Sequence, residues 1–203
     1  MSDDRVRTGR DVALVIVAGA IALRWPTAAL IALFAAGSVV RWVDGRSWTS
    51  TRPVEPWQLA AGAAIGAAAL ALALGVADPL VAGATARSVE WTQVTAVRGS
   101  AGALVTVALL VGAQAVAAEL VFRRWLVDRA LDAGRSTWAA AALAGVAEAW
   151  VAGGAVAPRL GVAVAGTALG VIYVGAGRRV AVSLPARLTF ELGVLVLVWQ
   201  RLV

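Results

Sequence analysis

The chain has 203 residues, of which 61% are hydrophobic and 15% are charged, whereas soluble domains are roughly half apolar and about a quarter charged. It contains no cysteine and no histidine, which excludes disulfides, thiol nucleophiles, imidazole bases and zinc–thiolate sites; no metal or cofactor is expected. The formal net charge of +6 comes from arginines that flank apolar blocks, a pattern typical of membrane topology signals rather than of nucleic-acid binding.

The apolar blocks predict an all-α, polytopic transmembrane bundle of six to seven helices, folded as a single membrane domain over residues 1–203. The first block, 11–40, is split by Arg24, Trp25 and Pro26. It is either one crossing helix or a short helical hairpin with Pro26 at the start of its second helix. The hairpin with a cytoplasmic N-terminus places more arginines on the cytoplasmic side, so the positive-inside rule favours it.

Further along the chain, helices are predicted at 56–76, 100–123, 137–155, 160–176 and 183–201, each close to the ~20 residues that a bilayer crossing needs. The segment 77–99 is too polar to span, and we expect an interfacial helix there with Trp91 at headgroup level. Other tryptophans at predicted helix ends are interpreted as interfacial anchors; they are Trp42, Trp57, Trp125, Trp138 and Trp199. The pairs Gly62/Gly66 and Gly166/Gly170 are expected to allow ordinary close helix packing.

Charged side chains inside apolar helices are the candidates for function, because they are costly in a membrane and usually face the bundle interior in pairs. Glu119 and Arg123 are four residues apart in the helix 100–123, and Arg187 and Glu191 have the same spacing in the last helix. Glu148 has no such partner on its own helix, so an arginine from another helix must reach it if it is to be paired. We expect one shared polar cluster, whose role is either structural or functional.

The stretch AAELVFRRWLVDRAL at 117–131 resembles the first motif, Glu-Glu-x-x-x-Arg, of the CPBP intramembrane proteases (CAAX endopeptidases and bacteriocin-processing proteins). The Gly-rich helix GVAVAGTALGVIYVGAGRR and the last polar helix follow in the family's order. The resemblance covers about residues 100–203 and implies a CPBP-like core there, with Glu119 and Arg123 in positioning roles.

Departures from the family motifs imply that the catalytic site is lost. Ala118 stands where the family has its water-activating glutamate, and Glu148 stands where the second motif, Phe-x-x-x-His, has histidine after Ala144. The third motif fits loosely at Glu191 and Leu195, with Phe190 as another possible equivalent of its first position. A general base and an oxyanion stabiliser are both missing, and loss of a single oxyanion donor already costs about 100- to 1,000-fold.

These observations predict a non-catalytic, CPBP-like protein of the bacterial cytoplasmic membrane. Its expected role is that of an accessory or assembly subunit, bound to another integral membrane protein or complex such as a transporter, and to membrane lipid. Two alternatives remain open at this point. One is an active glutamate-type intramembrane endopeptidase, with the glutamates as base or as an all-oxygen divalent metal site. The other is a small proton- or cation-coupled carrier that uses Glu148, Glu191 and Arg187, although we find no internal repeat of the kind that carriers usually have.

Overall fold

The computed structural model describes residues 2–22, 24–46, 48, 53–77, 79, 97–152 and 156–200. All regular secondary structure in these residues is helical, and no strand occurs among them. This confirms the predicted all-α class. The interfacial helix predicted at 77–99, including Trp91, lies outside the described residues except at 77, 79 and 97–99.

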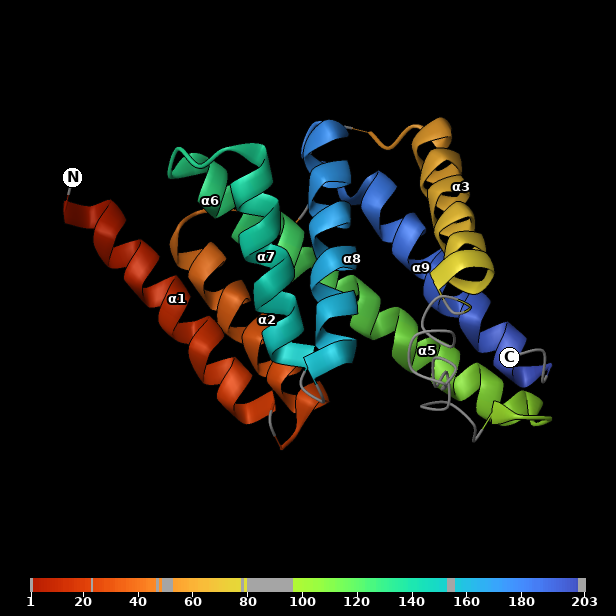
Figure 1. Ribbon diagram of the computed structural model, residues 1–203. Helices are drawn as coiled ribbons and strands as arrows, with labels where there is room; N and C mark the ends of the chain where they lie inside the picture. Colours follow the sequence, from red (N-terminus) through yellow and green to blue (C-terminus); the bar gives the residue numbers. More distant parts are fainter. Residues whose placement is uncertain are drawn as a thin grey trace. The chain divides into compact units, whose positions relative to one another are not determined.

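The chain divides into two compact units. Unit 1 consists of Met1–Pro53 and Val116–Ser183, and unit 2 consists of Val54–Ala115 and Leu184–Val203. Two of the boundaries between the units fall within long helices, one in α5 (Ala101–Ala118) and one in α9 (Val180–Trp199). Figure 1 shows each of these helices as a continuous ribbon. Residues 100–203, where the CPBP-like core is expected, therefore contribute to both units.

Unit 1 begins with two helices, α1 (Ser2–Ala22) and α2 (Pro26–Val43), which lie side by side (Figure 1). The backbone N–H groups of Arg24 and Trp25 both donate to the carbonyl oxygen of Ile21 and close the end of α1. Pro26 occupies the first turn of α2, where its missing N–H leaves no hydrogen bond unmade. The segment 11–40 therefore forms parts of two helices rather than one continuous helix.

α5 continues without a break through a π-helical segment, η3 (Glu119–Val127), into α6 (Asp128–Asp132), giving a helix of 32 residues. The prediction that this helix ends at Arg123 was wrong. The consecutive arginines in FRRW look like a membrane boundary in the sequence. In the structure, Trp125 and Val127 after them are buried against other helices of unit 1, and this packing stabilises the continued helix.

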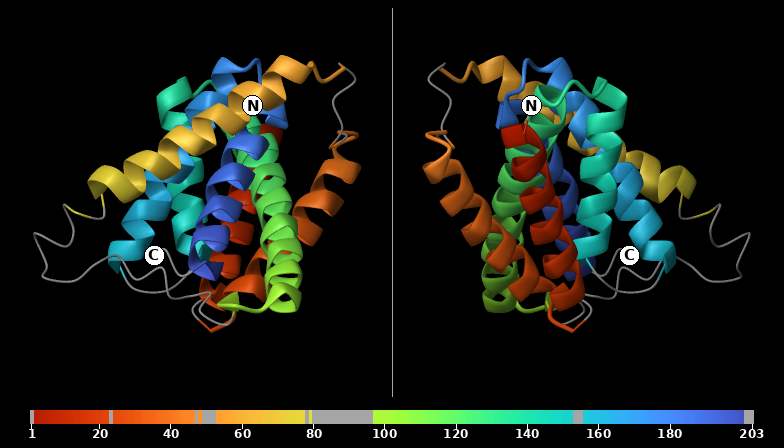
Figure 2. Two further views of the ribbon diagram at one scale, coloured as in Figure 1. Left: turned by 90° about the vertical axis from the view of Figure 1, so that its right-hand side faces the viewer. Right: turned by 90° about the vertical axis from the view of Figure 1, so that its left-hand side faces the viewer.

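α7 (Thr137–Ala152) and α8 (Val156–Gly175) form the closest helix pair in unit 1 and lie side by side in both views of Figure 2. Their contact depends on small residues. A Cβ atom at Gly170 would lie 2.8 Å from the Cβ atom of Ala141, which is closer than packed carbon atoms normally come. The predicted packing role of Gly166 and Gly170 is thus confirmed for these two helices.

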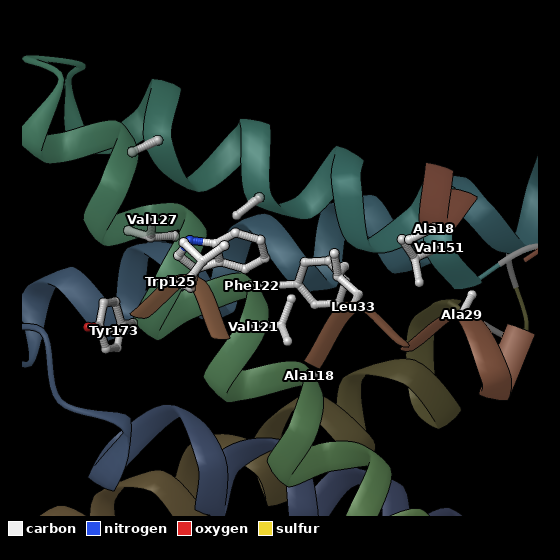
Figure 3. Packing of buried hydrophobic residues seen from close by; sticks show 13 residues of the cluster. Ala18, Ala29, Leu33, Ala118, Val121, Phe122, Trp125, Val127, Val151 and Tyr173 are labelled. Carbon is white, nitrogen blue, oxygen red and sulfur yellow. The ribbon is translucent and has the colours of Figure 1, made fainter. Parts of the chain in front are cut away.

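The hydrophobic core of unit 1 is built around the π segment. Figure 3 shows the rings of Phe122 and Trp125 beside each other beneath α7, with Val121 and Leu33 close by. Trp125 is only 2% exposed, and its ring lies against Gly37 of α2. The interpretation of Trp125 as an interfacial anchor was therefore wrong: other helices of unit 1 cover this helix end and bury the indole.

Unit 2 contains α3 (Pro56–Leu72), its π-helical extension η1 (Ala73–Ala77), and most of α5 and α9. Gly62 and Gly66 lie on the buried side of α3, and a Cβ atom at Gly66 would collide with the carbonyl oxygen of Ala186 in α9. A smaller hydrophobic cluster joins Val97 to Leu195 and Val198. Glycine thus provides the close approach of α3 to α9, as expected for this spacing.

In the part of the chain that the structure describes, three helices are long and apolar enough to cross a membrane: Pro56–Val76, Ala101–Asp132 and Val180–Trp199. Only 11%, 22% and 33% of the residues in their apolar windows are buried inside the protein. Shorter apolar helices occupy Ala28–Val43, Thr137–Ala152 and Arg159–Gly175. Most residues in the apolar windows of these three helices are therefore not buried.

Candidate functional site

Arg123 lies between two glutamates in the interior of unit 1. Its Nη2 atom donates a hydrogen bond to Oε2 of Glu148 at 2.7 Å, and its Nε atom lies 3.6 Å from Oε1 of Glu119. All three side chains are buried. The structure thus brings together three of the five predicted site residues, and an arginine from another helix does reach Glu148.

The stronger of these two pairs is the one between helices. The 2.7 Å distance to Glu148 is that of a charge-assisted hydrogen bond, whereas 3.6 Å to Glu119 is too long for one. Both Glu119 and Arg123 belong to the π-helical segment Glu119–Val127, whose turns close by hydrogen bonds to the fifth residue along. Arg123 is turned toward α7.

Gly145 and Gly166 bring α7 and α8 into contact beside Glu148. A Cβ atom at position 166 would lie 2.9 Å from Oε2 of Glu148 and 2.9 Å from Cα of Gly145. The carboxylate therefore rests directly on the backbone of α8, in a space that any larger residue would fill. The two glycines are needed for the placement of the carboxylate as well as for the packing of the helices.

We expect Gly166→Ala to lower the free energy of unfolding by about 1–3 kcal/mol, because the added methyl group must displace Glu148 or separate the helices. Gly161→Ala is the matched control on the same helix, since a Cβ atom there meets nothing within 4 Å. The control should be neutral or stabilising by up to about 1 kcal/mol. Thermal unfolding of the two detergent-solubilised variants measures the difference, and equal midpoints would contradict the packing described here.

Three apolar residues at positions compared with the family motifs, Ala118, Ala144 and Leu195, lie in hydrophobic clusters. Ala118, at the position of the family's first glutamate, is 2% exposed and belongs to the hydrophobic core of unit 1, as does Ala144. Leu195 is buried against Val97 and Val198 in unit 2. None of these three positions carries a group that can activate water.

Arg187 and Glu191 belong to unit 2 and form an ion pair with each other, with Nε of Arg187 2.8 Å from Oε1 of Glu191. Both side chains are partly exposed. The predicted local pairing in the last helix is therefore present. That these two residues share a cluster with Glu119 and Glu148 stays a prediction.

A second charged network, which sequence reasoning missed, lies in unit 1 where α1, α2 and α6 meet. Nε of Arg129 donates to Oδ2 of Asp11 at 2.8 Å, and its Nη2 donates to Asp44, which also pairs with Arg10 at 3.6 Å. Asp11 is buried. The sequence signal was weak, because each aspartate lies at the edge of an apolar block, where a solvated residue is the usual interpretation.

Asp128 was missed in the same way. Its Oδ1 atom accepts a hydrogen bond of 2.9 Å from the hydroxyl of Tyr173, and its Oδ2 atom lies 3.9 Å from Nη1 of Arg124. Both Asp128 and Tyr173 are buried. The bond to Tyr173 joins the last part of the 32-residue helix to α8. Asp128 thus helps to fix the packing of these two helices.

Within the residues that the structure describes, no three histidine, cysteine, aspartate or glutamate side chains are grouped so that they could hold a metal ion. Of the buried charges, Arg123 pairs with Glu148 and Asp11 pairs with Arg129, each across two helices. Comparison of the chain with family models, curated proteins and solved structures gives no match.

Proposed function

We propose that this chain is a polytopic α-helical membrane protein with a CPBP-like core and no protease activity. In this proposal it is an accessory or assembly subunit of the bacterial cytoplasmic membrane, with a cytoplasmic N-terminus. Its partner is another integral membrane protein or complex, such as a transporter, together with membrane lipid. The proposal rests on the motif resemblance at 117–131 and on the geometry of the buried charges.

The observation that carries the proposal is the position of Arg123 between Glu119 and Glu148. A general base must have a lone pair within reach of the proton that it removes. Oε2 of Glu148 already accepts a hydrogen bond of 2.7 Å from the buried guanidinium of Arg123, so this oxygen is engaged in an ion pair. The arrangement supports a structural role in which one arginine joins η3 to α7.

Helix lengths and exposed side chains support the membrane location. The candidate span Val180–Trp199 has 20 residues, which corresponds to about 30 Å and matches the thickness of the hydrocarbon core. α2 carries strongly exposed tryptophans near both ends, Trp25 at 64% and Trp42 at 81%, as is common at membrane interfaces. The apolar residues of the three long helices that are not buried suit lipid or the helices of a partner.

Purification from gently solubilised membranes tests the subunit role. We expect a membrane protein to accompany the full-length chain in a fixed ratio, and to remain with it through gel filtration. A second preparation in a harsher detergent should release the partner and leave the chain alone. A chain that is recovered by itself from several mild detergents would contradict the subunit proposal.

Peptide hydrolysis tests the loss of catalysis. Purified wild-type protein is expected to leave membrane-segment peptides uncleaved, with the same background as Glu119→Gln and Glu148→Gln. These variants keep the shape of the side chain and remove its charge. Cleavage by the wild type that either variant abolishes would overturn the pseudoenzyme proposal and favour the peptidase alternative.

A further inference from the structure

We propose that Arg46 and Arg178, held together by Asp132, form a clamp for the phosphate of an anionic phospholipid at one end of unit 1. Nη1 of Arg46 lies 2.7 Å from Oδ2 of Asp132, and Nη1 of Arg178 lies 3.2 Å from Oδ1 of the same carboxylate. The two arginine side chains are 41% and 45% exposed. One carboxylate therefore fixes two exposed guanidinium groups next to each other.

Each guanidinium has five N–H donors in a planar fork that suits phosphate oxygens. The Nη1 atom of each guanidinium group binds Asp132. The remaining donors can bind a phosphate without breaking the pair with Asp132. Because two cations share one anion, the exposed group keeps a net charge of +1 and attracts an anionic headgroup.

Around the clamp, the acidic side chains are paired inside the protein and arginines are exposed, so the surface there is positive. Asp11, Asp44 and Asp128 are turned inward and bound by Arg129, Arg124, Arg10 or Tyr173. Arg135, three residues beyond Asp132, is exposed. Nearby acids are thus neutralised within the protein, while arginines face outward.

The backbone at Arg178 also supports the proposal. Its φ of 61° lies in the left-handed region, which is uncommon for residues other than glycine and asparagine and costs free energy. The turn is held by the N–H of Arg178, which donates to the carbonyl of Tyr173, and by its own carbonyl, which accepts from Arg124. The strained turn directs this arginine toward Asp132.

Lipid is the favoured source of the phosphate because the clamp lies at helix ends. Arg46 follows α2 and Arg178 follows α8, whose apolar stretches are Ala28–Val43 and Arg159–Gly175. Their ends fall at headgroup level if these helices cross the bilayer. The inference thus rests on the membrane location within the proposed function, but not on the subunit role.

Native mass spectrometry of the full-length chain with added lipid tests the clamp. We expect wild-type protein to bind phosphatidylglycerol more tightly than phosphatidylcholine of the same acyl chains, and inorganic phosphate at millimolar concentration not to compete. Equal affinity for the two lipids would overturn the proposal without any variant. Competition by inorganic phosphate would overturn the assignment to lipid.

The double variant Arg46→Gln/Arg178→Asn should lose phosphatidylglycerol affinity by about fivefold for each arginine, about 25-fold in total, with phosphatidylcholine binding unchanged. Asparagine keeps the left-handed backbone at 178. The control, Arg24→Gln/Arg159→Gln, removes the same charge at the opposite ends of α2 and α8 and should change affinity less than twofold. Equal losses in the two double variants would contradict a specific clamp.

Asp132→Asn separates geometry from net charge. The clamp predicts weaker phosphatidylglycerol binding, because the two guanidinium groups are no longer held together. Tighter binding, as the gain of one positive charge alone would produce, would overturn the clamp. If the chain purifies without a partner but still prefers phosphatidylglycerol, the subunit role is rejected and this inference stands. The two proposals can therefore fail separately.

Discussion

Arg123→Met is expected to lower the free energy of unfolding by about 3–5 kcal/mol, because it removes the buried positive charge that contacts both carboxylates. Arg123 is fully buried and contacts both Glu119 and Glu148. The matched control is Arg187→Met, which breaks the partly exposed pair with Glu191 and should cost no more than about 1 kcal/mol. Thermal or denaturant unfolding in detergent measures both changes.

A charge-free cluster should recover much of that loss. The triple variant Glu119→Gln/Arg123→Met/Glu148→Gln removes all three charges of this cluster together, and replacement of a whole buried ion cluster is often nearly neutral. Stability that stays as low as in the single variant would show that the loss comes from packing of the arginine stem. A small effect of Arg123→Met alone would contradict the structural role assigned to this residue.

Trp125→Ala is expected to cost about 3–5 kcal/mol, the range for truncation of a large aromatic side chain in a core. The indole fills space between η3 and α2, where it contacts Gly37. Trp42→Ala is the matched control, because Trp42 is 81% exposed and an exposed substitution usually changes stability by less than about 0.5 kcal/mol in water.

Unfolding midpoints of these two tryptophan variants also decide between the two interpretations of Trp125. An interfacial anchor should respond like Trp42, with a loss that depends on the surrounding detergent or lipid. A core residue loses the same stability in every detergent. Similar small shifts for both variants would contradict the burial of Trp125.

Much of the local structure could be predicted from the sequence because helices form through short-range spacing and composition. Long apolar blocks predicted α3, α5, α7, α8 and α9, and the structure places helices there with ends that differ by a few residues except at Arg123. The sequence also identified Glu119, Arg123 and Glu148 as misplaced charges in apolar helices. These features depend on residues within a few turns of each other.

The partners of those charges depend on packing between helices, which the sequence does not reveal. Spacing of four residues favoured Glu119 as the main partner of Arg123, but the shorter contact is with Glu148 of α7, whose carboxylate lies against Gly166 of α8. Asp11 and Arg129 are 118 positions apart in the chain, and only folding brings them together.

The sequence by itself determined that this protein is helical and apolar, where most of its helices lie, and which charged residues needed explanation. Only the tertiary structure decided that Trp125 is in the core, that Arg123 joins η3 to α7, and that Asp132 holds Arg46 beside Arg178. The physical reason is that a helix is stabilised by its own backbone hydrogen bonds, whereas burial and charge pairing depend on which helices lie against it.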